Sequence, residues 1–166
     1  MTFAMKCDNA KGNTIEMQVD KELCLKFPVV LRDKLLNNEI ELPDTTQFEY
    51  DKLFTYRAVE RSKDDDQEVT LEDFKSYFEL RKLPKTPRGL VGDITKDPHY
   101  YGVSSFLKRE IVEQIMKFPN PKKKLAAGYV YSAGGPQNTK DQHVCWWLYE
   151  GADVSGFKII EEKNDE

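Results

Sequence analysis

Residues 12–56 read GNTIEMQVDKELCLKFPVVLRDKLLNNEIELPDTTQFEYDKLFTY, and this stretch decides the predicted fold. Alternating apolar residues at 14–19 predict a strand, and the turn formers before it join it to a second predicted strand at 2–7. The alternation at 39–43 predicts a further short strand that ends at a proline. No comparable run has the pattern of a catalytic motif, so the stretch predicts a scaffold that binds other proteins.

Helices are predicted between and after these strands. Asp20 is a predicted N-cap, and Pro28 lacks the N–H group that a helix interior needs, so we expect two short helices with a break at this proline. The second should end at Asn37-Asn38, because asparagine tolerates the left-handed conformation of a helix stop. Apolar spacing then predicts a third helix that starts after a cap at 44–46 and fades at Arg61.

The middle of the chain alternates polar loops with predicted helices. Residues 62–68, SKDDDQE, predict a surface loop, since their charges repel one another and the ligand spacing of a calcium loop is missing. A capping pair at Thr70 predicts a helix through Arg81 or Lys82. Prolines and glycines predict irregular structure at 83–98, and an apolar stripe predicts a helix at 100–116.

The C-terminal third has a different composition, rich in aromatic and β-branched residues. Strands are predicted within 128–132, 143–150 and 157–162, separated by turn-rich segments. They predict an antiparallel β meander. The fold class is therefore α+β, with one domain at 1–118 and a β-rich extension at 119–166.

Composition and charge exclude several classes of protein. A net charge of −4 provides no basic footprint for nucleic acid. No stretch approaches the ~20 apolar residues that cross a bilayer, and the N-terminus does not read as a signal peptide. Three widely spaced cysteines predict neither a disulfide framework nor a metal clip. We expect no metal, no cofactor, no membrane partner, and a cytoplasmic or nuclear location.

Catalytic candidates are few. His143 and Cys145 would share one face of a strand, which makes them a candidate thiol–base pair for a small thiol-dependent enzyme. Such i, i+2 pairs also arise by chance, and a partly buried thiol beside a rim histidine is the simpler interpretation. We therefore expect no enzyme, with the thiol pair as an alternative.

Trp146 and Trp147 are the most informative aromatic pair. Adjacent strand residues point to opposite faces, so one of them can pack in a simple core while the other faces solvent or a partner. Burial of both between the meander and the helices is the simpler interpretation, and an exposed contact is the alternative. Because tryptophan is favoured in protein-binding hot spots, both are candidate partner-binding residues.

The order of these elements resembles the BTB/POZ family. The resemblance is carried by VDKELCLKFPVVLRDKLL at 19–36, IELPD at 40–44 with the helix predicted after it, and PHYYGVSSFL at 98–107. Asp20 and the acidic loop at 62–68 are most similar to the cullin-ligase adaptor branch, which includes elongin C and the F-box-binding adaptor. The chain departs from the family at 82–97, which carries prolines and glycines, and in its β-type C-terminus.

The resemblance implies a BTB/POZ-like core and a non-catalytic adaptor that links a partner to a cullin-type ubiquitin ligase. The residues matching the family's cullin-facing surface are His99 and Tyr100, with Phe48 and Tyr50 on the earlier predicted helix. Homodimer formation, common in the wider family, stays open. A viral or parasite-type interaction protein, binding a host factor through its aromatic C-terminus, is a further alternative.

Overall fold

The computed structural model describes residues 21–81 and 93–160. Within them the chain forms one six-stranded antiparallel sheet with helices on both faces, an α+β architecture, in the strand order β4-β5-β2-β1-β3-β6. The strands are β1 Leu53–Glu60, β2 Val103–Phe106, β3 Lys123–Val130, β4 Gln137–Lys140, β5 His143–Trp146 and β6 Lys158–Ile160.

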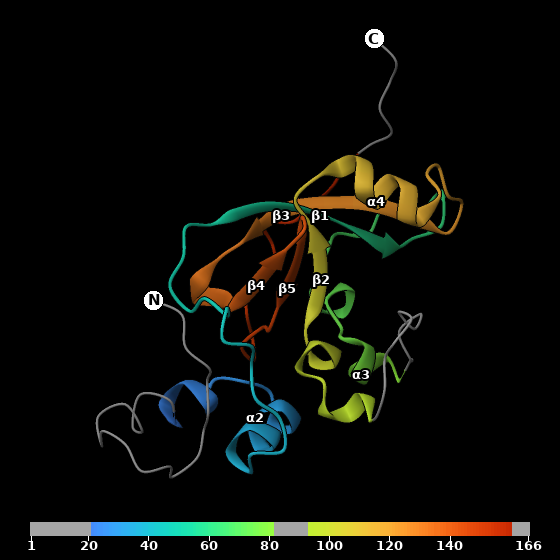
Figure 1. Ribbon diagram of the computed structural model, residues 1–166. Helices are drawn as coiled ribbons and strands as arrows, with labels where there is room; N and C mark the ends of the chain where they lie inside the picture. The colour runs from blue at the N-terminus through green and yellow to red at the C-terminus, as the bar shows by residue number, and fades with distance from the viewer. Residues whose placement is uncertain (1–20, 82–92, 161–166) are drawn as a thin grey trace.

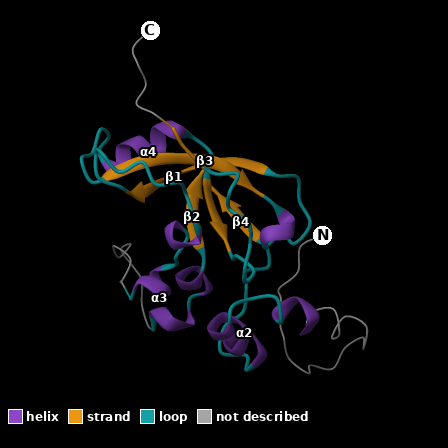
Figure 2. Ribbon diagram, turned by 180° about the vertical axis from the view of Figure 1, so that it is seen from behind, coloured by secondary structure: helices purple, strands orange, loops and turns teal. Residues whose placement is uncertain are grey.

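The helices are short and gather at two ends of the sheet. Both views show α4 lying over β1 and β3, and α2 and α3 at the opposite end of the molecule (Figures 1 and 2). The α-helices are α2 Val29–Leu36, α3 Tyr77–Leu80 and α4 Arg109–Met116; the 3-10 helices are η1 Leu71–Asp73, η2 Ile94–Lys96, η3 Pro98–Tyr101 and η4 Ser132–Gly134.

The first helices agree with the sequence prediction. Residues 21–24 are helical, and Pro28 separates them from α2. The helix α2 ends at its C-cap, Asn37, and Asn38 has the expected left-handed φ of 58°. The predicted strand at 39–43 is reduced to a single bridge residue, Leu42. The predicted strands at 2–7 and 14–19 and the predicted cap Asp20 lie outside the described residues.

The predicted helix ending at Arg61 is wrong, because β1 occupies its second half. Eight cross-strand pairs join β1 to β3, from Leu53↔Val130 to Glu60↔Lys123. Thr55 and Val59 are buried, as the period of a strand requires. The local apolar spacing was compatible with a helix, but pairing with a distant strand and the burial it brings decide the conformation.

Two other predicted helices are split. The helix from Thr70 becomes η1 and α3, although Thr70 does form the predicted capping box, with Asp73. A second capping box, Ser76 with Glu79, starts α3. The helix at 100–116 holds only in its second half, because residues 103–106 form β2 and pair with β1 and β5. Residues 62–68 contain no helix or strand, as predicted.

The predicted antiparallel meander is also wrong in its topology. All the strands are antiparallel, but β2 and β1 lie between β5 and β3. The two strands from the predicted domain 1–118, β2 and β1, therefore lie in the middle of one sheet, with two strands from 119–166 on each side. Next to β5 lies β4, joined to it by a tight turn in which Asp141 and Gln142 both have positive φ, 52° and 72°. Such turns match the twist of a hairpin.

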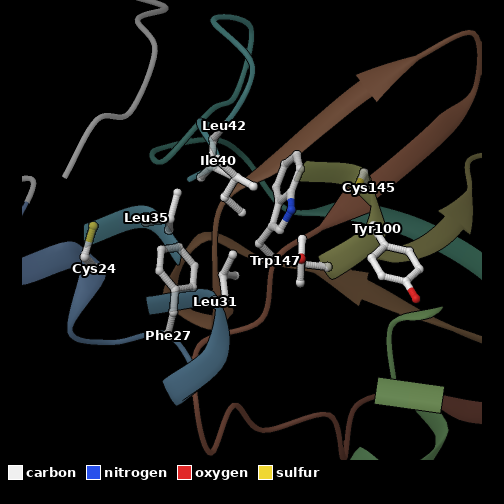
Figure 3. Packing of buried hydrophobic residues seen from close by; sticks show 10 residues of the cluster. Cys24, Phe27, Leu31, Leu35, Ile40, Leu42, Tyr100, Cys145 and Trp147 are labelled. Atoms are coloured by element: carbon white, nitrogen blue, oxygen red, sulfur yellow. The ribbon is translucent and has the colours of Figure 1, made fainter. Parts of the chain in front are cut away.

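Trp146 and Trp147 lie in different hydrophobic clusters on opposite faces of the sheet. Trp146 packs in a cluster with Phe74 and Phe157, and its indole N–H donates to the Gly135 carbonyl at 3.1 Å. Trp147 packs on the other face, and its indole N–H donates to the Pro98 carbonyl at 2.9 Å. Figure 3 shows Trp147 among its neighbours, which are Cys24, Phe27, Leu31, Leu35, Ile40, Leu42, Tyr100 and Cys145. A third cluster lies under α4.

A buried ion pair holds η1 against β1. The Arg61 guanidinium donates to both Asp73 carboxylate oxygens at 2.7 Å, and the two side chains are only 6% and 10% exposed. Arg61 also donates to the Gln67 and Glu68 carbonyls in the loop between β1 and η1. Arg57 donates to the Asp73 carbonyl at 2.9 Å. Burial acts to raise the pKa of Asp73, but the hydrogen bonds from Arg61 and Thr70 and the arginine charges outweigh it, so the pKa lies below its ordinary value.

Replacing either tryptophan by alanine should unfold the protein more easily. Trp146→Ala and Trp147→Ala should each lower the free energy of unfolding by about 3–5 kcal/mol, because each leaves a cavity in a separate cluster. The matched control is Ile115→Ala on α4, where the side chain is 60% exposed and the change should stay within about 0.5 kcal/mol. Urea denaturation measures all three. A tryptophan variant as stable as the control would contradict the two-sided packing.

Asp73 should make stability depend on pH in acid. Its folded pKa is depressed, so its contribution is present above the unfolded-state pKa of about 4 and is lost as the pH falls through the lower folded value. At pH 7, Asp73→Asn should lower the free energy of unfolding by about 3 kcal/mol, because it leaves Arg61 buried without its counter-ion. The difference between wild type and variant should shrink between pH 5 and pH 2. Denaturation at several pH values measures this difference, and a constant difference would argue against the ion pair.

Candidate functional site

An apolar groove opens between α2 and the η1–α3 segment, and we name it the α2–α3 groove. Its volume is about 350 Å³. Pockets that bind ligands have volumes from about 300 Å³ upward and mostly apolar walls. The groove is lined by Pro28, Val29, Val30, Leu31, Leu71, Phe74, Ser76, Phe78, Glu79, Tyr101, Val103, Leu148, Tyr149, Glu150 and Gly151.

One wall is the start of α2. This helix, VVLRDKLL, buries Leu31 and Leu35 in the cluster around Trp147. Val29 and Val30 point elsewhere and remain 52% and 41% exposed. The helix therefore has apolar side chains on more than one side, and the protein's own core covers only one of them.

The opposite wall is built by two capping boxes in succession. Thr70 starts η1, which presents Leu71 at 41% exposure, and Ser76 starts α3. Tyr77 and Leu80 on α3 are also more than 40% exposed. Since Asp73 belongs to the first capping box and to the ion pair with Arg61, this wall is anchored to the sheet.

The floor of the groove is formed by well-packed residues. Val103 begins β2, and Tyr101 precedes it at the end of η3. The Tyr101 hydroxyl donates to the Thr95 carbonyl at 2.7 Å, and burial raises its pKa to about 12. The Phe78 ring packs on the Tyr101 ring with centroids 5.1 Å apart. The floor of the groove is therefore held in place by contacts within the protein.

The charges in the groove have one sign. Glu79 and Glu150 are the ionisable carboxylates in its lining, and neither lysine nor arginine is among the lining residues. Glu79 is exposed, and its Oε1 accepts from the backbone N–H of Ser76 at 3.0 Å and from the Ser76 hydroxyl at 3.2 Å. Glu150 is exposed on the loop after β5.

The residues predicted from the cullin-facing surface lie outside this groove. His99 has an exposed side chain whose Nδ1 lies 3.0 Å from Asp97 Oδ1. Tyr100 is 9% exposed and belongs to the cluster around Trp147, so it closes the core. Phe48 packs half-buried against the same cluster. Tyr50 donates its hydroxyl to the Gly135 carbonyl at 2.7 Å, and burial raises its pKa. Of these four residues, His99 has the most accessible side chain.

The predicted contact role of Trp146 and Trp147 is not compatible with their burial. Their exposed fractions are 1% and 0%. They do point to opposite faces, as predicted, but both faces are covered at this position. A partner cannot touch either ring unless the fold rearranges.

Cys145 and His143 do not form an activated pair. Cys145 is 2% exposed, and burial raises the pKa of its thiol, with the charge of Asp97 adding to the effect. A nucleophilic cysteine needs the opposite shift. His143 Nε2 instead lies 2.9 Å from the Ser104 hydroxyl, and burial lowers the pKa of the imidazole. Ser104, which lies opposite Cys145 in the sheet, was missed from sequence because only the pairing of β2 with β5 brings it there.

The described cysteines differ in their chemical state. Cys24 is disulfide-bonded, whereas Cys145 is a free thiol.

Residues 21–81 and 93–160 contain neither a candidate metal cluster nor a helix that could span a membrane. In these residues no group of three or more histidine, cysteine or acidic residues could hold a metal ion. In the same residues no helix has the length and apolar character to cross a bilayer.

Comparison with protein-family models, curated proteins and solved structures gives no match. The resemblance to the BTB/POZ family therefore stays a prediction. The α2–α3 groove has to be interpreted from its own geometry and chemistry.

Cys145 should react slowly with thiol reagents in the folded protein. Its sulfur is buried and its pKa is raised, so both access and thiolate are lacking at neutral pH. Labelling with iodoacetamide at pH 7.5, followed by peptide mass spectrometry, should be at least about tenfold slower at Cys145 in the folded chain than in the chain unfolded in urea. Equal rates would revive the thiol-enzyme alternative.

Proposed function

We propose that this protein is a non-catalytic protein-interaction module and that the α2–α3 groove is its binding surface. The observation that carries the proposal is the exposure of Val29, Val30 and Leu71 around an apolar groove of about 350 Å³. Burying apolar surface supplies about 25 cal/mol per Å², so a partner segment with apolar side chains gains most at this position.

The chemistry of the groove also favours recognition over catalysis. Its lining contains no histidine and no cysteine. The polar side chain of Ser76 is engaged in a helix cap. Anchored walls and a packed floor reduce the entropy that binding has to overcome, because few side chains become ordered on contact.

The resemblance to the cullin-ligase adaptors extends this proposal. In that role the groove would hold one protein while a second surface, with the exposed His99, faces a cullin. The finer role rests on the resemblance, whereas the groove rests on the exposed side chains.

Placing a charge on the groove wall should abolish partner binding. Val30→Asp should reduce recovery of bound proteins from an extract of expressing cells by about tenfold or more, because a carboxylate in an apolar contact costs at least 1.4 kcal/mol. Ile115→Asp is the matched control, since Ile115 is also an exposed apolar helix residue, on α4 and outside the groove lining. Capture with wild type, variant and control, quantified by mass spectrometry, makes the comparison.

Proteins that depend on Val30 and not on Ile115 would support the groove. If all three baits recovered the same proteins in the same amounts, the groove would have no binding role. An immunoblot for cullins on the same fractions tests the adaptor role separately. Circular dichroism of the three proteins establishes that the variants are folded.

A further inference from the structure

We infer that the α2–α3 groove selects an apolar peptide segment that carries at least one arginine or lysine. The inference rests on the proposed function and specifies the partner's chemistry. It depends on the two carboxylates of the lining, Glu79 and Glu150, and on the absence of a basic residue from that lining.

Glu79 is held ready to accept a cation. Its Oε1 receives two hydrogen bonds from Ser76, one from the backbone and one from the hydroxyl, and these fix the orientation of the carboxylate at the start of α3. The side chain is nonetheless exposed. An oriented acceptor that remains accessible loses little entropy when a partner's ammonium or guanidinium group binds to it.

The described basic residues near the groove form no close ion pair with these carboxylates, although the charge of Lys75 is attracted to Glu79. On the α3 side, Lys75 pairs with Glu72 at 2.8 Å, and Arg81, two residues after Glu79, is exposed. On the α2 side, the Lys26 ammonium lies 5.2 Å from the centre of the Tyr149 ring. Among the residues that the structure describes, neither Glu79 nor Glu150 forms an ion pair within 4.0 Å. Within the described residues, the negative charge of both exposed carboxylates therefore stays open to a partner.

Apolar walls and an acidic rim together restrict the occupant. A purely apolar segment would leave the carboxylates without a counter-charge, and an acidic segment would be repelled by them. A segment that presents apolar side chains to Val30 and Leu71 and a basic side chain to Glu79 or Glu150 satisfies both features. We therefore expect the groove to bind apolar peptides and, among them, to prefer those with a positive charge.

Peptide selection tests this inference with the full chain. A phage library of random 16-residue peptides is selected on the wild-type protein and counter-selected on Val30→Asp, and the enriched peptides are synthesised with a fluorescent label. Their dissociation constants are measured by anisotropy on wild type, Glu79→Gln, Glu150→Gln and the double variant. Glu110→Gln is the matched control, because Glu110 is an exposed glutamate on α4, outside the groove.

The expected peptides combine apolar residues with arginine or lysine. Each single glutamine variant should raise the dissociation constant about twofold to fivefold, the range of an exposed ion pair, while Glu110→Gln leaves it unchanged. Raising salt from 50 to 500 mM should weaken binding to wild type more than to the double variant. Glu79→Gln keeps an oxygen to accept from Ser76, so the fold should not change.

The experiment distinguishes failure of the inferred charge selectivity from failure of the proposed binding surface. Peptides that need Val30 but lack basic residues, and bind the glutamine variants as tightly as wild type, would overturn the selectivity inferred for the groove and leave its binding role standing. If no enriched peptide loses affinity for Val30→Asp, the proposed binding surface itself is wrong, and the selectivity falls with it.

Discussion

The adjacent tryptophans at the end of β5 impose the constraint on which the rest of the fold depends. Neighbouring residues of a strand project to opposite faces, and both Trp146 and Trp147 are almost fully buried. The sheet must therefore be covered on both faces at this position. Residues 21–42 and η3 cover the Trp147 face, and Phe74, Val154 and Phe157 cover the Trp146 face. Each indole N–H also finds a backbone carbonyl, so this burial leaves no donor unsatisfied.

The α2–α3 groove is a consequence of this two-sided packing. One wall is formed by α2, which packs on the Trp147 face of the sheet. The other is formed by η1, which packs on the Trp146 face. Tyr101 belongs to the first cluster and Phe74 to the second, and both line the groove. The two groups of residues that cover the opposite faces meet at the end of the sheet, and their side chains do not fill the space between them. This space is the groove. Val29, Val30 and Leu71 are the apolar residues left exposed there.

Polar interactions hold the walls of the α2–α3 groove in place and give its lining a negative charge. The Arg61–Asp73 pair holds η1 on the sheet, and the second capping box orients Glu79 on α3. By contrast, the candidate thiol pair of Cys145 and His143 is not activated, although His99 remains exposed. Cys145 is buried with a raised pKa, and His143 hydrogen-bonds to Ser104 and has a lowered pKa. The accessible chemistry of the α2–α3 groove is thus that of apolar contact and negative charge, which suits recognition of another protein.

The sequence by itself determined the features that depend on neighbouring residues. Pro28 and Asn38 predict the limits of α2, and Thr70 predicts a cap. The aromatic C-terminal runs contain β5 and β6 and overlap the end of β3, whereas β4 lies in a segment predicted to be a turn. Only the tertiary structure decided that 53–60 is a strand, that β1 and β2 separate β5 from β3, and that both tryptophans are buried. The physical reason is that caps and breaks act over a few residues, whereas strand pairing and burial are decided by segments far apart in the chain. The α2–α3 groove is also decided by the packing of segments far apart in the chain. The run Val29-Val30-Leu31 signals more apolar surface than one helix face can bury, but only the packed fold shows which of its side chains stay uncovered.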